Sequence, residues 1–204
     1  MQTGASEKTG DPCAAVLIAS SAGGVQGLTA LLRGLDATLP VPVLVAQHLN
    51  RSRETSIVAI LSRATCLKVK LAEDGERPRP ATVYIAPPDR HLCVRDDRTL
   101  VLTREDRVNF ARPAADPLFE SAAEAFGPVV GCVLTGSDSD GARGVEAVKA
   151  RGGTVLVQDP ETAEFRGMPK SAISTGKADL VLTLEAMGSA IDRLVRGRPL
   201  PRHR

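Results

Sequence analysis

The chain has 204 residues, an apolar fraction of 43 % and a formal net charge of +2, which suits one domain with a single core. So small a charge, with no tryptophan and one tyrosine on which bases could stack, argues against a nucleic-acid partner. Residues 1–11 are polar and no run of about 18 apolar residues exists, so we expect no membrane span, no secretory signal and a cytoplasmic protein.

Composition divides the chain into three parts. Residues 1–13 are mostly polar and predict a disordered lead-in. Residues 198–204 are rich in arginine and proline and predict a basic, solvated tail. The folded, catalytic-sized domain is expected over residues 14–197.

The first predicted strand, residues 14–19, runs into the turn that organises the chain. The apolar run breaks at Ser20, passes Gly23 and Gly24, and opens into a segment with apolar residues at helical spacing. Ser20 therefore stands at the carboxyl end of a strand, where ligands and chemistry collect in an open α/β sheet. The first turn of the following helix presents unpaired N–H groups.

Strands and helices then alternate along the chain. Further strands are predicted at residues 41–46, 67–71, 129–135, 154–158 and 180–183, with helical segments near residues 57–64, 118–126, 145–148, 169–175 and 185–196. Three short β-runs at residues 82–86, 91–95 and 99–103 favour antiparallel hairpins inserted into this plan. The predicted fold class is α/β: a doubly wound, mostly parallel sheet in a three-layer, Rossmann-like arrangement with an antiparallel hairpin insertion.

Three of these strands end in residues that together suit hydrolytic chemistry. Ser20 follows the first strand, His48 the second, and Asp138 and Asp140 follow the strand at residues 129–135. A serine attacks an ester or amide only if an imidazole removes its proton, and a carboxylate must orient that imidazole. The pattern predicts a serine hydrolase with Ser20 as nucleophile, His48 as base, and Asp140 or Asp138 as the orienting residue.

Structural interpretations compete with this one. Ser20 or Ser21 could cap the helix after the glycines, and Asp140 could cap the helix that begins at Gly141. His91, in the hairpin region, is interpreted as structural.

Other ligand-binding motifs do not match. The spacing Gly23-Gly24-x-x-Gly27 departs from the dinucleotide fingerprint, and the order Ser, His, Asp departs from the α/β-hydrolase order. The four cysteines are far apart without Cys-x-x-Cys spacing, so the sequence predicts no metal site.

Nine sequence blocks occur in one order along the chain. They are Ile18-Ala-Ser-Ser-Ala-Gly-Gly24, Ala46-Gln-His48, Ala72-Glu-Asp-Gly-Glu76, Val83-Tyr-Ile-Ala-Pro-Pro-Asp-Arg-His-Leu92, Arg112-Pro-Ala-Ala-Asp-Pro-Leu-Phe-Glu-Ser121, Val133-Leu-Thr-Gly136 with Asp140-Gly-Ala142, Gly152-Gly153, Val157-Gln-Asp-Pro160 and Gly167-Met-Pro169. Over residues 14–187 the chain resembles the catalytic domain of the bacterial chemotaxis protein-glutamate methylesterases, the CheB family. Nine blocks in order make the resemblance specific.

The resemblance implies a serine hydrolase that removes methyl groups from γ-glutamyl methyl esters on the cytoplasmic helices of methylated chemoreceptors, or on a related signalling protein. Some members also deamidate receptor glutamines. The resemblance assigns Ser20 as nucleophile, His48 as general base and Asp140 as the residue that orients it, with the backbone N–H groups of Ser21 and Ser137 as oxyanion donors. It implies no metal or organic cofactor.

Two features depart from the family pattern. The family usually reads Gly-Met-Gly-x-Asp-Gly, whereas Ser137 and Asp138 replace the Met and the second Gly here; an aspartate beside an oxyanion hole is expected to lower activity. The residues before Ala14 leave no room for the family's receiver domain, so we expect no phosphorylation in cis.

Two alternatives to the methylesterase stay open. One is a catalytically weak or inactive signalling or binding module of the same fold, and the other is an esterase for a small molecule. For a receptor substrate, Arg51, Arg53 and Arg166 are candidate contacts to acidic residues of the receptor. The equal alternative is that these arginines only form a solvated rim and contact no substrate.

Overall fold

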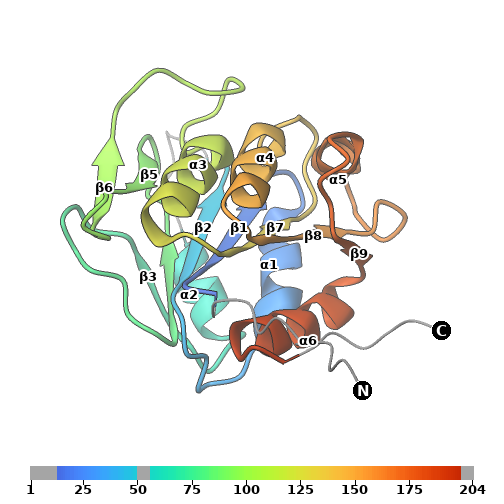
Figure 1. Ribbon diagram of the computed structural model, residues 1–204, viewed down its shortest axis with the longest axis horizontal. Helices are drawn as coiled ribbons and strands as arrows, with labels where there is room; N and C mark the ends of the chain where they lie inside the picture. Colours follow the sequence, from blue (N-terminus) through green and yellow to red (C-terminus); the bar gives the residue numbers. More distant parts are fainter. Residues whose placement is uncertain (1–12, 50–55, 199–204) are drawn as a thin grey trace, which may run out of the picture.

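A parallel sheet with helices on both faces forms the body of the computed structural model, which describes residues 13–49 and 56–198 (Figure 1). The elements are, in chain order, β1 (Val16–Ser20), α1 (Gly24–Arg33), β2 (Val43–Gln47), α2 (Ile57–Ser62), β3 (Lys68–Leu71), β4 (Thr82–Ile85), β5 (His91–Val94), β6 (Leu100–Thr103), α3 (Ala115–Phe126), β7 (Val130–Val133), α4 (Ala142–Ala150), β8 (Thr154–Gln158), α5 (Gly167–Ser174), β9 (Leu180–Leu182) and α6 (Leu184–Val195). The predicted lead-in and tail lie, except for Cys13 and Arg198, outside the described residues.

The seven-stranded sheet has the order β3-β4-β2-β1-β7-β8-β9, and each of its neighbouring pairs is parallel. A separate pair, β5 and β6, is antiparallel. The predicted fold class is confirmed. One detail was wrong: β4 belongs to the parallel sheet and not to the hairpins. Its four residues are all buried, because helices and loops cover a parallel sheet on both sides.

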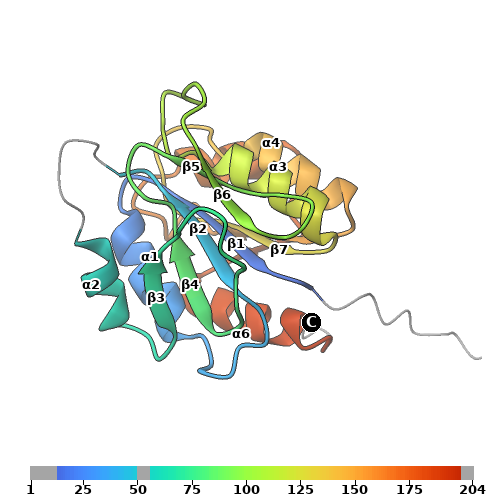
Figure 2. The ribbon, with the colours of Figure 1, turned by 90° about the vertical axis from the view of Figure 1, so that its left-hand side faces the viewer.

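Alternate residues of each central strand face opposite helical layers. Val16 and Ile18 of β1 point into the core beneath α1, α2 and α6, whereas Leu17 and Ala19 pack into the core beneath α3, α4 and α5. Figures 1 and 2 show the sheet between these two layers. Continuous apolar runs therefore become strands that are buried on both faces.

The switch in chain direction across the sheet determines where ligands can bind. From β1 the chain crosses to β2 on one side, and from β7 it crosses to β8 on the other, although β1 and β7 are neighbours. The loops after these two strands meet at the carboxyl edge of the sheet, where Thr135 accepts a hydrogen bond from the amide of Ser21; this edge is the usual ligand site of open α/β sheets.

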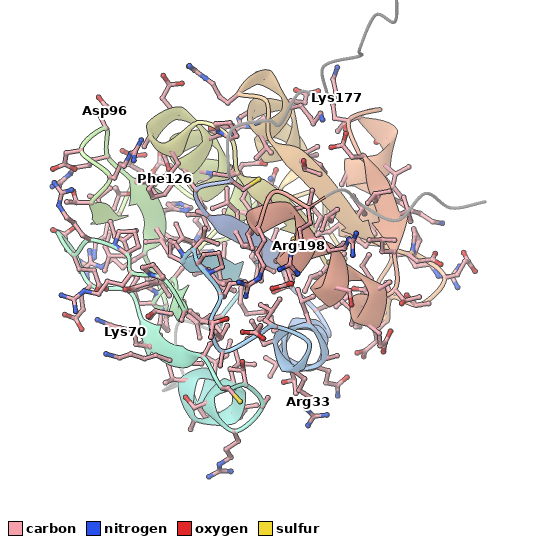
Figure 3. The ribbon with its side chains drawn as sticks, turned by 60° about the horizontal axis from the view of Figure 1, so that its bottom comes forward. Arg33, Lys70, Asp96, Phe126, Lys177 and Arg198 are labelled. Carbon is pink, nitrogen blue, oxygen red and sulfur yellow. The ribbon has the colours of Figure 1, made fainter. Side chains whose placement is uncertain are left out.

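Exposed charged side chains of both signs surround this core. Arg33, Asp96 and Lys177 point away from the molecule in Figure 3. Over the described ranges, no helix combines the length and apolarity needed to cross a bilayer.

Helices α3 and α4 approach each other closely at a glycine. A Cβ atom added to Gly144 of α4 would lie 2.5 Å from Cβ of Phe119, a fully buried residue of α3. The absence of a side chain at Gly144 thus lets the two helices pack together beside the loop that connects β7 to α4.

We expect Gly144→Ala to lower the free energy of unfolding by about 1–3 kcal/mol, because the added methyl overpacks a dry contact. Urea denaturation of both proteins measures the change. Glu146→Ala, at an exposed position of the same helix, is the matched control and should change it by less than about 0.5 kcal/mol. Equal stability of Gly144→Ala and the parent chain would contradict this packing.

Candidate active site

The two adjacent serines after β1 have different partners. Ser20 is fully buried, and its Oγ donates a hydrogen bond to Gln47 Oε1 at 2.7 Å. Ser21 is partly exposed, and its Oγ lies 2.9 Å from His48 Nδ1. The structure therefore corrects the prediction that placed Ser20 against the imidazole: Ser21 is the serine that meets His48.

The strand register explains this one-residue difference. Ser20 is still paired with Gln47 in the β1–β2 ladder. The side chains of these two residues therefore lie on the same face of the sheet. Ser21 is the first residue beyond the strand and turns toward His48, which follows β2 in the same way. In the sequence, the only signal for this choice is where the strand ends.

The side chain of Gln47 links the carboxyl ends of β1 and β2 by hydrogen bonds. Its Nε2 donates to the carbonyl oxygens of Ser21 at 2.8 Å and His48 at 3.0 Å, while its Oε1 accepts from Ser20. A Cβ atom on Gly24 would collide with the Gln47 amide, so these hydrogen bonds of Gln47 require glycine at the start of α1. Ser20 and Gln47 thus position Ser21 and His48 without touching the reacting atoms.

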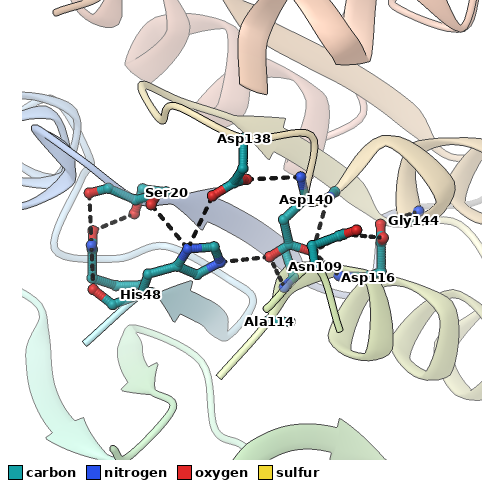
Figure 4. A network of polar contacts seen from close by, with 12 residues as sticks. Ser20, His48, Asn109, Ala114, Asp116, Asp138, Asp140 and Gly144 are labelled. Atoms are coloured by element: carbon teal, nitrogen blue, oxygen red, sulfur yellow. Dashed lines mark hydrogen bonds and ion pairs between the residues drawn. The ribbon is translucent and has the colours of Figure 1, made fainter. Parts of the chain in front are cut away.

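The opposite nitrogen of His48 contacts a fixed carboxylate. His48 Nε2 lies 2.8 Å from Asp140 Oδ2, as Figure 4 shows, and the side chain of Asp140 is wholly buried. Its oxygens also accept hydrogen bonds from the amides of Ala115 at 2.5 Å, Asp116 at 3.1 Å and Gly141 at 3.0 Å. Asp140 therefore contacts the imidazole from the position where the sequence expects the orienting carboxylate, and the N-cap of α4 is Gly141.

This arrangement selects the imidazole tautomer. Because an ionised carboxylate is only an acceptor, Nε2 of His48 carries the proton it donates to Asp140. In the neutral ring Nδ1 is then unprotonated and can accept the proton of Ser21. Ser21, His48 and Asp140 together have the geometry of a nucleophile, a general base and an orienting acid.

The predicted oxyanion donors need one correction. The amide of Ser21 donates to the carbonyl of Thr135 at 3.0 Å and is therefore occupied. Within residues 13–49 and 56–198, no acceptor is paired with the amides of Ala22 or Ser137. Ala22 directly follows the nucleophile candidate at the entrance to α1, so its amide takes the place of that of Ser21 as a candidate donor.

An open cavity of about 300 Å³ beside Ser21 is lined by Gly23, Gly24, Gln26 and Glu164, among others. In the described part of the chain, no group of three or more His, Cys, Asp or Glu side chains could hold a metal ion. His91 has the structural role expected of it, since its Nε2 lies 3.0 Å from the carbonyl oxygen of Asp106 and its Nδ1 accepts from the amide of Ala114.

Known proteins are similar to this chain in fold and in sequence. The family model described as CheB methylesterase matches residues 16–191. The chain belongs to the CheB methylesterase family. The crystal structure of the Thermotoga maritima CheB methylesterase catalytic domain superposes with a TM-score of 0.86 and 37 % sequence identity, covering 90 % of this chain and 99 % of that one.

Curated relatives of two lengths are similar to this CheB-family chain. A putative protein-glutamate methylesterase/protein-glutamine glutaminase of Leptospira interrogans is 39 % identical over 181 residues, which are 88 % of this chain and 94 % of the relative. The corresponding enzyme of the group 3 operon of Rhizobium meliloti is 39 % identical over 191 residues, 93 % of this chain and 54 % of the relative. The chain thus spans nearly all of one relative and about half of the other.

A second carboxylate touches His48 in this member of the CheB family. Asp138 Oδ2 lies 3.4 Å from His48 Nδ1, the nitrogen that also faces Ser21, and Asp138 Oδ1 accepts from the amide of Asp140 at 2.9 Å. The sequence placed Asp138 beside the oxyanion; the structure places its carboxylate on the base.

Two carboxylates make the imidazole strongly basic. Burial by itself lowers the pKa of His48, but the hydrogen bonds to Asp138 and Asp140 outweigh it and raise this pKa to about 9. Burial opposes ionisation of Asp138 too, yet its hydrogen bonds to His48 and to the Asp140 amide lower the pKa of its carboxyl. Near neutral pH the ring is therefore mainly an imidazolium, which cannot accept the serine proton.

We expect kcat/KM for a small ester such as p-nitrophenyl acetate to rise with pH and level off above about 9, since only the neutral form of His48 is the base. Asp138→Asn removes one charge from Nδ1, so the inflection should move toward neutral pH and the rate at pH 7 should rise about tenfold. The pH–rate profiles of both proteins measure this. Identical profiles would show that Asp138 does not control the base.

Proposed function

We propose that this chain is a protein-glutamate methylesterase that hydrolyses γ-glutamyl methyl esters on chemoreceptors, with Ser21 as its nucleophile. The observation that carries the proposal is the Ser21–His48–Asp140 arrangement at the carboxyl ends of strands in a CheB-family fold. A binding module that had lost activity would have no need of a serine, a base and an oriented carboxylate in hydrogen-bonding sequence.

The first half of the reaction forms an acyl-enzyme. Ser21 Oγ attacks the ester carbonyl while its proton passes to His48 Nδ1. Negative charge develops on the carbonyl oxygen, and the amides of Ala22 and Ser137 donate hydrogen bonds to it. When the tetrahedral intermediate collapses, the protonated His48 gives its proton to the methoxy oxygen, methanol leaves, and the glutamyl group remains esterified to Ser21.

The second half reverses these roles. A water molecule enters where methanol left, His48 Nδ1 takes one of its protons, and the resulting hydroxide attacks the acyl carbon. Collapse of the second intermediate returns the proton to Ser21 Oγ and releases a glutamate carboxylate. Asp140 stabilises the imidazolium in both halves and keeps its ring oriented.

Deamidation of glutamine follows the same route with a different leaving group. The amide nitrogen must be protonated before it departs as ammonia, and His48 Nδ1–H is placed to supply that proton. The relatives' names include protein-glutamine glutaminase, and we include this activity in the proposal.

The proposed partner is the cytoplasmic, helical part of a methylated chemoreceptor, which would place the enzyme in the cytoplasm. Among the arginines suggested as contacts, Arg166 is exposed, adjoins Gly136 through a β-bridge and pairs with Glu161 at 3.1 Å. Arg51 and Arg53 lie outside the described residues.

Methanol release from a methylated chemoreceptor fragment tests the proposal with an internal control. Ser21→Ala should lower the rate by about 10³-fold or more, since Ser21 Oγ is the hydroxyl that residues 13–49 and 56–198 bring within hydrogen-bonding distance of His48. Ser20→Ala, one residue away, loses only the hydrogen bond to Gln47 and should keep activity within about tenfold. An inactive Ser20→Ala beside an active Ser21→Ala would overturn the assignment, and no release by the unaltered chain would overturn the methylesterase.

A further inference from the structure

The loop between β6 and α3 ends in a tight turn of unusual composition. Val108 and Ala111 exchange both backbone hydrogen bonds, at 3.2 Å and 2.9 Å, and the two residues between them have positive φ, 50° at Asn109 and 61° at Phe110. These features define a two-residue hairpin turn of type I′, for which Asn-Gly is the favoured sequence. Phe110 occupies the position that favours glycine.

Phe110 brings the fold no visible benefit. Its side chain is 93 % exposed, so the ring buries almost no apolar surface. A bulky residue in left-handed backbone conformation is also unfavourable compared with glycine. Where a residue breaks both a backbone rule and a burial rule, a functional role is the expected compensation.

The turn is anchored to the active site. Asn109 Nδ2 lies 3.4 Å from Asp140 Oδ1 and 3.2 Å from Asp116 Oδ2, and Figure 4 shows Asn109 beside the carboxylate that holds His48. Arg112 ties the base of the loop to Asp89 at 2.8 Å and to the carbonyls of residues 104 and 105. Figure 2 shows this loop standing out from the body of the molecule. The turn that carries the exposed ring is thus held beside Asp140.

Substrate geometry requires contacts at this rim. In a glutamyl methyl ester the ester carbon is three bonds from Cα, about 4 Å at most, so the backbone of the substrate must pass close to Ser21. Residues three or four positions away on a helical substrate lie on the same face as the ester. Side chains that surround Ser21 therefore face the neighbours of the modified residue and not the ester itself.

We propose that Phe110 is a docking residue for the protein substrate, packing against an apolar side chain one or two turns from the methylated glutamyl residue of an α-helix. The inference rests on the proposed function and adds a specificity element to it. Exposed aromatic rings are the side chains that contribute most to protein recognition, because they bury a large area at low cost in side-chain entropy. A small ester has no helix that could contact this ring.

The test compares Phe110→Gly, Phe110→Leu and the parent chain on a methylated receptor fragment and on p-nitrophenyl acetate. For Phe110→Gly the ratio of kcat/KM on the fragment to kcat/KM on the ester should fall about tenfold, mainly through KM. Phe110→Leu keeps an apolar contact and should lie between them. The melting temperature of Phe110→Gly should rise by about 2–4 °C, because glycine suits the turn.

Val181→Ala is the matched control, since Val181 of β9 is also an exposed apolar residue, at 46 %, and should leave the ratio unchanged. An unchanged ratio in Phe110→Gly would overturn the docking role. A parallel loss on both substrates would overturn it too, because it would mean that the turn acts through Asn109 on Asp140. If the parent chain turns over the ester but not the fragment, the proposed function fails, and this inference fails with it.

Discussion

The buried carboxylate of Asp140 is the interaction on which the rest of the site depends. It receives the amides of Ala115 and Asp116 from the first turn of α3 and the ring of His48 from the loop after β2. A helix N-terminus stabilises an anion through its free N–H groups and its dipole, so the first turn of α3 holds the Asp140 carboxylate on the side away from His48. Helix α3, which packs on α4 at Gly144, thus holds the carboxylate that contacts His48.

The second carboxylate, Asp138, changes what that base can do. A base whose pKa stands near 9 is mostly protonated at neutral pH, and the same charge also makes the imidazolium a stable intermediate. Asp138 thus lowers the fraction of His48 that is neutral and can act as a base, and it stabilises the imidazolium form. Because Asp138 and Ser21 share the same nitrogen of His48, the carboxylate and the nucleophile compete for one hydrogen-bonding position.

The sequence predicted the elements that follow from hydrophobic periodicity. It missed the one-residue difference that decides which serine meets His48. Alternating apolar strands and amphipathic helices gave the parallel sheet, and the ends of those strands gave His48 and Asp140. Ser20 and Ser21 are chemically identical neighbours, so only the point at which β1 ends distinguishes them. Ser20 lies within the strand and bonds to Gln47, whereas Ser21 lies beyond it and meets His48. The turn at Asn109 and Phe110 was missed as well, because its left-handed backbone carries an aromatic residue in place of glycine.

Covalent labelling of the nucleophile tests the central claim most directly. The chain would be treated near pH 9 with phenylmethylsulfonyl fluoride, which sulfonylates an activated serine, and the modified peptide would be fragmented in a mass spectrometer to locate the added mass. The account predicts modification of Ser21, and its loss in Asp140→Asn, which cannot hold His48 in the required tautomer. Modification of Ser20, or equal labelling with and without the Asp140 carboxylate, would contradict it.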